Sequence, residues 1–159
     1  MTFHRFCVFT ASFYALSCVA APPSELAENL VDTARKNCEA LDAGLFEVDP
    51  AYIVTLDLDG DGQPDELVDE SHFSCSSSAS LFTPNGGYML HAIVNGAVFS
   101  WQVNGWRTVD WGKDKVLLLA EHGTECGGYG YQPCYEAVVF SEHRPMSVRP
   151  GESESSSSP

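Results

Sequence analysis

The chain has 159 residues, with 22 acidic and 8 basic side chains and a formal net charge of −14. This balance argues against binding to nucleic acid or to anionic membrane surfaces, because both need basic patches. The length fits about one domain with a genuine hydrophobic core. We therefore expect a soluble domain, with a cation site as one possible reason for the excess of acids.

Residues 1–21 are typical of a secretory signal peptide. His4 and Arg5 make a polar, basic start, a mostly apolar run follows, and Val19-Ala20-Ala21 offers small residues for cleavage. The apolar run is too short for a membrane span. We expect export to the periplasm or the exterior.

A lipoprotein signal, with Cys18 as the lipidated residue, is the alternative. The residue three places before that cysteine is Ala15, where a branched aliphatic side chain is expected. The sequence therefore favours a cleaved, unlipidated leader.

Four cysteines remain after the leader is removed. An even number of cysteines in an oxidising compartment predicts two disulfides, with three possible connectivities. We favour Cys38–Cys75, which would tie a helix to the sheet, and Cys126–Cys134, which would close a short glycine-rich loop.

The first predicted element is a helix over residues 24–43. Ser24 is a good N-cap, Glu25 places an acid in the first turn, and Gly44 is a stop signal. One face is apolar, and we expect it to pack on the sheet. Its members are Leu26, Leu30, Ala34, Cys38 and Leu41.

Residues 51–149 read as an antiparallel meander of about six to eight strands, so the fold class is α+β and mainly β. Asn95-Gly96 and Asn104-Gly105 separate β-rich runs, and we expect a hairpin turn at each pair because Asn-Gly accepts positive φ at both positions. Residues 22–150 then form one domain, and the serine-rich residues 151–159 form a disordered tail.

Residues 57–65 carry a spacing that argues for a metal site. Asp57, Asp59, Asp61 and Asp65 stand at positions 1, 3, 5 and 9, and Gly62 stands at position 6. Hard oxygen ligands in a flexible loop suit Ca²⁺, and without a cation these carboxylates would repel one another.

This loop is not an EF-hand. Position 12, where a bidentate glutamate is needed, is Val68, and position 8 is Pro64, which has no N–H. The predicted flanking elements are strands. Over residues 57–68 the pattern resembles the DxDxDGxxD loops of FG-GAP and VCBS-type repeats, in which a calcium loop joins two strands. One copy does not support a propeller.

The resemblance implies that Asp57, Asp59, Asp61 and Asp65 bind Ca²⁺ together with the main-chain carbonyl of Gln63. An acidic hairpin loop without an ion is the alternative. If calcium binds, we expect a structural role, since extracellular modules use weak sites for this purpose.

The segment from His122 to Cys134 is a second candidate site. It could bind zinc through His122, Cys126 and Cys134, or present Cys126 as a nucleophile with His122 as its base. Both roles need free thiols, so export favours a disulfide-closed loop instead.

The remaining candidates have structural explanations. No Gly-x-Ser-x-Gly motif occurs, and His72, His91 and His143 are isolated and expected to be structural or surface residues. The tryptophans at 101, 106 and 111 could form an aromatic platform for sugars. However, Phe99 and Val103 share one strand face with the first of them, which favours core packing.

These features favour a secreted or periplasmic, monomeric, non-enzymatic domain with a structural calcium loop. Its partner would be an unidentified protein or glycan, with no nucleic acid and no membrane span. The alternatives are a periplasmic hydrolase that uses the metal loop or the His122–Cys126 region, and a secreted enzyme inhibitor.

Overall fold

The computed structural model describes residues 22–112 and 114–148. The predicted signal peptide, Cys18 within it, and the predicted tail at 151–159 lie outside the described residues. Within the described residues the chain forms one α-helix and ten strands. The fold is mainly β with a helix, as expected, but the estimate of about six to eight strands was too low.

The additional strands are short or lie at an edge, which explains why sequence periodicity did not reveal them. β1 (Phe46–Val48) and β4 (Phe73–Cys75) have three residues each and form a small antiparallel ladder of their own. β10 (Arg144–Val148) contains Pro145, which is compatible with the edge position that this strand occupies.

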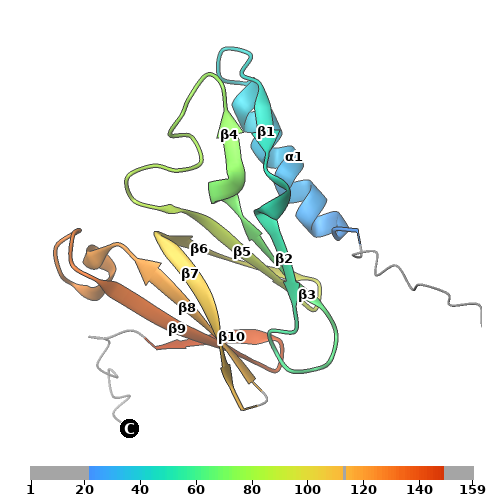
Figure 1. Cartoon of the computed structure of the whole chain (residues 1–159), viewed down its shortest axis with the longest axis vertical. Helices are drawn as coiled ribbons and strands as arrows, with labels where there is room; N and C mark the ends of the chain where they lie inside the picture. The colour runs from blue at the N-terminus through green and yellow to red at the C-terminus, as the bar shows by residue number, and fades with distance from the viewer. Residues whose placement is uncertain (1–21, 113, 149–159) are drawn as a thin grey trace, which may run out of the picture.

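The remaining strands form two four-stranded antiparallel sheets rather than one continuous meander (Figure 1). We call them the first and the second sheet. The first sheet has the order β2 (Ile53–Leu56), β3 (Asp65–Asp69), β5 (Tyr88–Val94), β6 (Ala97–Val103). The second has the order β10, β9 (Cys134–Ser141), β8 (Asp114–Glu121), β7 (Gly105–Trp111).

A core of aliphatic side chains lies between the two sheets. Alternate residues of each strand point into it, as the two-residue period of a strand requires. Its fully buried members include Leu67 of β3, Leu90 of β5, and Leu117 and Leu119 of β8. Leu58 also belongs to this core, although it lies in the loop that follows β2.

The helix α1 (Glu25–Glu39) covers part of the other face of the first sheet (Figure 1). Ala27, Val31, Ala34 and Cys38 are its buried residues. They belong to a second hydrophobic cluster that includes Val68 of β3 and several aromatic rings. Its rings are Phe73, Phe82 and, partly buried, Phe46 and Tyr52.

The start of α1 agrees with the sequence prediction, whereas its end does not. Ser24 is the N-cap, and its side chain accepts a hydrogen bond from the Ala27 N–H. The helix ends at Glu39, before the expected stop at Gly44, because the chain reverses through Asp42 and Ala43 at positive φ. A Cβ at Gly44 would lie 2.7 Å from the Cys75 Sγ, so this glycine instead permits close packing against the disulfide.

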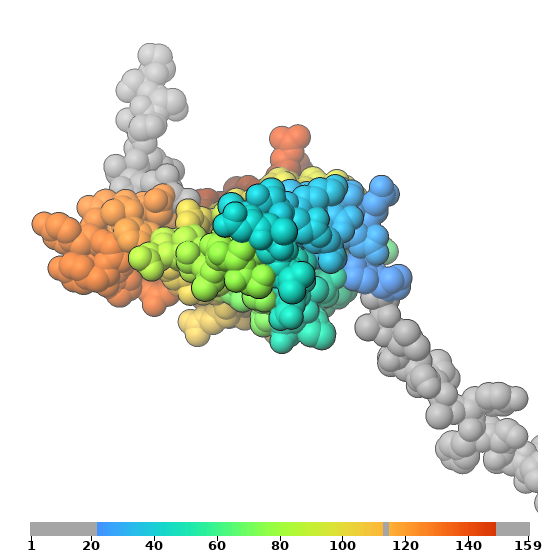
Figure 2. Space-filling model, turned by 90° about the horizontal axis from the view of Figure 1, so that it is seen from above, coloured from blue at the N-terminus to red at the C-terminus, as the bar shows by residue number. Residues whose placement is uncertain are grey.

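The two disulfides predicted from the cysteine count are present. One joins Cys38 to Cys75 and the other joins Cys126 to Cys134, which is the favoured connectivity. The first attaches α1 to β4. The second joins the last residue of the 3₁₀ helix η3 (Gly123–Cys126) to the first residue of β9, and this region lies at the opposite side of the molecule from α1 (Figure 2).

Only the first Asn-Gly pair forms a hairpin turn. Asn95 and Gly96 have φ of 45° and 75° and connect the paired strands β5 and β6. The hairpin predicted at Asn104-Gly105 is wrong, because β6 and β7 belong to different sheets. The Asn104 N–H donates to the Ala120 carbonyl of β8, and the chain bends at Asn104 as it passes from β6 to β7.

The three tryptophans have different environments. Trp101 and Trp106 pack against the core between the sheets, as expected. The Trp106 Nε1–H also donates to the Asp69 Oδ2 at 2.7 Å, which links the second sheet to the first. Trp111 is 74% exposed, so core packing is wrong for this residue.

Among the described residues there is no helix with the length and apolar character that a bilayer crossing would need.

The two disulfides should differ in their contribution to stability. They are separated by 37 and 8 residues along the chain. In the chain-entropy model the longer loop contributes about 4 kcal/mol and the shorter about 2.5 kcal/mol. We expect Cys38→Ala/Cys75→Ala to lower the free energy of unfolding more than Cys126→Ala/Cys134→Ala, as measured by urea denaturation. An equal or reversed order would contradict this.

Candidate metal centre

The acidic loop connects β2 to β3 and is closed by their pairing. The antiparallel register runs from Ile53 opposite Val68 to Leu56 opposite Asp65, so residues 57–64 form the connection. Leu58 is 1% exposed and packs between the two sheets. Burial of this side chain holds the flanking Asp57 and Asp59 at the rim of the core.

The carboxylates organise the loop through hydrogen bonds from the main chain. Asp57 accepts from the N–H groups of Gly60 at 2.8 Å and Gly62 at 3.0 Å. Asp59 accepts from the Asp61 N–H at 3.1 Å, and Asp61 accepts from the Gln63 N–H at 2.7 Å. Gly60 and Gly62 have φ of 75° and 84°, which glycine adopts without strain.

The predicted ligands form two overlapping groups. One oxygen from each of Asp57, Asp59 and Asp65 lies within 4.8 Å of the others. Asp59 and Asp61 form a second group with His143 under the same limit. The Asp-rich group could therefore hold a metal ion, and its donors are carboxylate oxygens, the chemistry that hard cations prefer.

Asp65 is buried as a whole residue, with 5% of its surface exposed. Burial raises the pKa of Asp65 above its usual range, and the nearby charges of Asp59, Asp61 and Asp57 raise it further. A hydrogen bond from the Leu58 N–H at 2.8 Å opposes this rise in pKa. A bound cation would favour the ionised form of Asp65.

His143 contributes to this centre although sequence analysis did not assign it. It lies in the turn between β9 and β10, where Glu142 and His143 have φ of 51° and 62°. Its Nδ1 lies 2.6 Å from the Asp59 Oδ2, and this hydrogen bond raises the pKa of His143. Figure 1 shows the β9–β10 turn beside the β2–β3 loop.

No short-range pattern could have identified this contact. His143 is 84 residues from Asp59, and the two meet because the sheets pack against each other. The Asp59 side chain is 3% exposed, so the imidazole supplies a polar partner to a buried carboxylate.

The second candidate site has the disulfide-closed loop that the sequence favoured, and not the zinc or nucleophile chemistry of the alternatives. Cys126 and Cys134 are joined in a disulfide, so neither can act as a thiolate ligand or nucleophile in this structure. The His122 Nδ1 lies 2.8 Å from the Thr124 Oγ1. This histidine also packs so closely on Gly130 that a Cβ there would lie 2.3 Å from its Nε2.

A serine, a histidine and a glutamate form a hydrogen-bonded chain that sequence analysis missed. The His91 Nδ1 lies 2.7 Å from the Ser100 Oγ, and its Nε2 lies 3.1 Å from the Glu70 Oε1. His91 and Ser100 are direct cross-strand partners. The two-residue turn at Asn95-Gly96 fixes that register, so the pair was accessible from the sequence, whereas Glu70 was not.

Comparison of the chain with protein-family models, with curated proteins and with solved structures finds no match.

The buried charge of Asp65 should destabilise the metal-free protein at neutral pH. Because its pKa is raised in the folded state, ionisation above that pKa costs folding free energy. We expect Asp65→Asn, which keeps an acceptor for the Leu58 N–H, to raise the melting temperature in chelator by a few degrees. Asp32→Asn, at an exposed position of α1, is the matched control and should have little effect. A lower melting temperature for Asp65→Asn would contradict the expected sign.

Proposed function

We propose that residues 22–150 form an exported, monomeric, non-enzymatic binding domain that is stabilised by Ca²⁺. The ion is bound by the side chains of Asp57, Asp59, Asp61 and Asp65 and by the main-chain carbonyl of Gln63. The observation that carries this proposal is the convergence of carboxylates from Asp57, Asp59 and Asp65 within 4.8 Å, in a loop with the DxDxDGxxD spacing.

The oxygen-rich donor set favours calcium over other common ions. Zinc prefers nitrogen and sulfur ligands, and magnesium demands a stricter octahedral geometry than a loop of this flexibility provides. His143 supplies one nitrogen, but it already contacts the Asp59 Oδ2. The imidazole and the ion therefore compete for that oxygen.

The position of the loop supports a structural role for the ion. Glu66, directly after Asp65, accepts hydrogen bonds from the Ser24 N–H and from the Ser24 hydroxyl at the start of α1. His143 connects the same loop to the second sheet. An ion that fixes residues 57–65 would therefore strengthen contacts among the helix and both sheets. The two disulfides support export to an oxidising compartment.

Thermal unfolding with and without calcium tests this proposal. A ligand at 100 times its dissociation constant stabilises the folded state by about 2.7 kcal/mol. For a domain of this size that corresponds to roughly 5–10 °C in melting temperature. We expect calcium to raise the melting temperature, chelator to reverse the effect, and equal concentrations of magnesium or zinc to do less.

Two matched variants distinguish calcium binding by the acidic loop from a general effect of removing one negative charge. Asp59→Asn should abolish most of the calcium response, whereas Asp32→Asn on the exposed face of α1 should keep it. A wild-type melting temperature that is insensitive to calcium, or an equal response of Asp59→Asn, would refute the calcium site.

A second candidate function, ester hydrolysis by Ser100, is supported by the Ser100–His91–Glu70 chain. In this function the Ser100 Oγ attacks the substrate carbonyl carbon while its proton passes to the His91 Nδ1, and Glu70 orients the ring through its Nε2. The proton then passes to the departing alcohol, and water releases the acyl group from Ser100. His91 is 7% exposed, so its ring is held in place, whereas Ser100 reaches solvent.

Ser100 opens on a hollow of about 250 Å³ that suits a small neutral or cationic ester. Gln102 lines the same hollow, and its amide could donate a hydrogen bond to a developing oxyanion. Glu121 and Glu125 also line it and disfavour anionic substrates.

A fluorophosphonate probe distinguishes a nucleophilic Ser100 from a structural hydrogen bond. Hydrolysis predicts that the wild type is labelled at Ser100 and that Ser100→Ala is not, as read by mass spectrometry of the intact chain. Ser74→Ala, at an exposed serine of β4, should label like the wild type. If the wild type does not react with the probe, hydrolysis by Ser100 is refuted, and the Ser100–His91–Glu70 hydrogen bonds have only a structural role.

A further inference from the structure

The face of the second sheet that points away from the core is apolar and uncovered by the described residues. Because side chains alternate along each strand, the residues on this outer face are those whose neighbours enter the core. Trp111, Met146 and Val148 are 74%, 59% and 73% exposed. Exposed apolar patches of this kind usually mark a binding surface.

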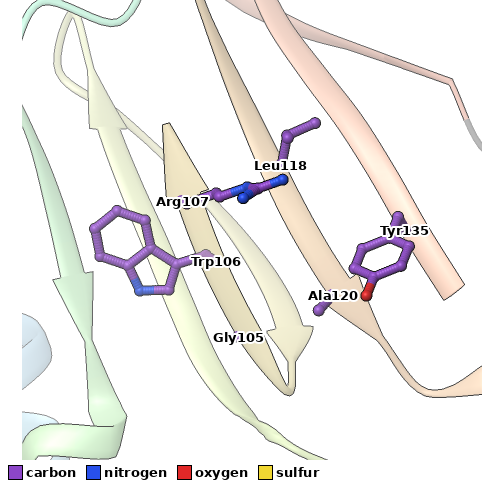
Figure 3. Close-up of a pocket in the computed structure, with 6 residues that line it drawn as sticks. All are labelled: Gly105, Trp106, Arg107, Leu118, Ala120 and Tyr135. Atoms are coloured by element: carbon purple, nitrogen blue, oxygen red, sulfur yellow. The ribbon is translucent and has the colours of Figure 1, made fainter. Parts of the chain in front are cut away.

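Two adjoining hollows run along this outer face. One of about 570 Å³ lies among apolar side chains that include Trp111, Val139 and Met146. The other, of about 400 Å³, is lined by Arg107, Ala120 and Tyr135 among others (Figure 3). Leu118 lines both, so they form one groove, and their volumes are those of small-molecule sites.

Arg107 is the only charged residue among the described residues that line the two hollows. It is exposed, and no ion pair of Arg107 occurs within the described part of the chain. In Figure 3 its side chain and that of Tyr135 lie on the same side of the sheet, whereas Trp106 points the other way, toward the first sheet. One end of the groove is therefore cationic and polar, and the rest is apolar.

We propose that this groove binds a fatty acid, with the carboxylate at Arg107 and the hydrocarbon chain lying toward Trp111 and Met146. The guanidinium matches the carboxylate head group, and burial of the acyl chain against apolar side chains is favourable. The four residue-to-residue steps from Arg107 to Trp111 along β7 span about 13 Å, a distance that a medium-length acyl chain covers.

A second copy of the chain fits this groove less well. A symmetric contact between two outer faces would bury Arg107 from each copy without a carboxylate in either groove. An unpaired buried charge is costly. The fatty acid supplies the missing anion. This inference deepens the proposed binding function and does not depend on the calcium loop.

Titration calorimetry with dodecanoate, below its micelle concentration, tests the proposal. We expect one molecule to bind per chain and Arg107→Gln to weaken binding at least tenfold. Lys36→Gln removes the same charge from an exposed position of α1 and should bind like the wild type. Val139→Glu places an anion in the apolar part of the groove and should abolish binding. Circular dichroism and thermal melting establish that each variant is folded.

The outcomes separate the possible occupants of the groove. Equal binding by Arg107→Gln and the wild type, or by Val139→Glu and the wild type, would overturn the proposal. The alternative outcome is that the wild type does not bind dodecanoate but forms dimers, as seen by light scattering, and that Val139→Glu dissociates these dimers. That result would assign the face to a second copy of the chain instead. Dodecanoate binding that persists in folded Asp59→Asn would support the groove even if the calcium proposal failed.

Discussion

Burial of Leu58 is the constraint on which the acidic loop depends. An aliphatic side chain between two aspartates enters the core between the sheets, and its neighbours must then lie at the rim of that core. Hydrophobic burial thus holds carboxylates closer together than their mutual repulsion would allow in a free loop. The hydrogen bonds from loop N–H groups and from His143 offset part of that repulsion.

The charges of the molecule are distributed unevenly over its two sheets. Carboxylates gather at the end of the first sheet where β2 turns into β3, whereas the groove on the second sheet has Arg107 as its charged residue within the described part. A chain with a net charge of −14 keeps an apolar face soluble more easily than a neutral chain would. The acids therefore serve solubility as well as the proposed ion site.

Local patterns predicted those features that depend on neighbouring residues. The Ser24 cap, the Asn95-Gly96 hairpin and the spacing of aspartates in the loop were all accessible, because each is decided within a few residues. Asn104-Gly105 has the same sequence signature as the true hairpin but crosses between sheets. Its conformation is decided by a hydrogen bond to Ala120, which a local pattern cannot contain.

Features that depend on the packing of distant segments could not be predicted from the sequence. His143 reaches Asp59, and Glu70 reaches His91, only after the strands have assembled. The exposure of Trp111 likewise follows from which face of the second sheet is left uncovered by the described residues. The sequence favoured a core position because Phe99 and Val103 share one strand face with Trp101, and that pattern says nothing about the face on which Trp111 lies.

The division of the chain between the two sheets has a consequence for folding. Apart from the β1–β4 ladder, the strands of the first sheet end at Val103 and those of the second begin at Gly105. Each sheet can therefore form from segments close together in sequence, which lowers the contact order and favours faster folding than an interleaved sandwich. We expect contacts such as Trp106 with Asp69 and His143 with Asp59 to form late, when the two halves dock.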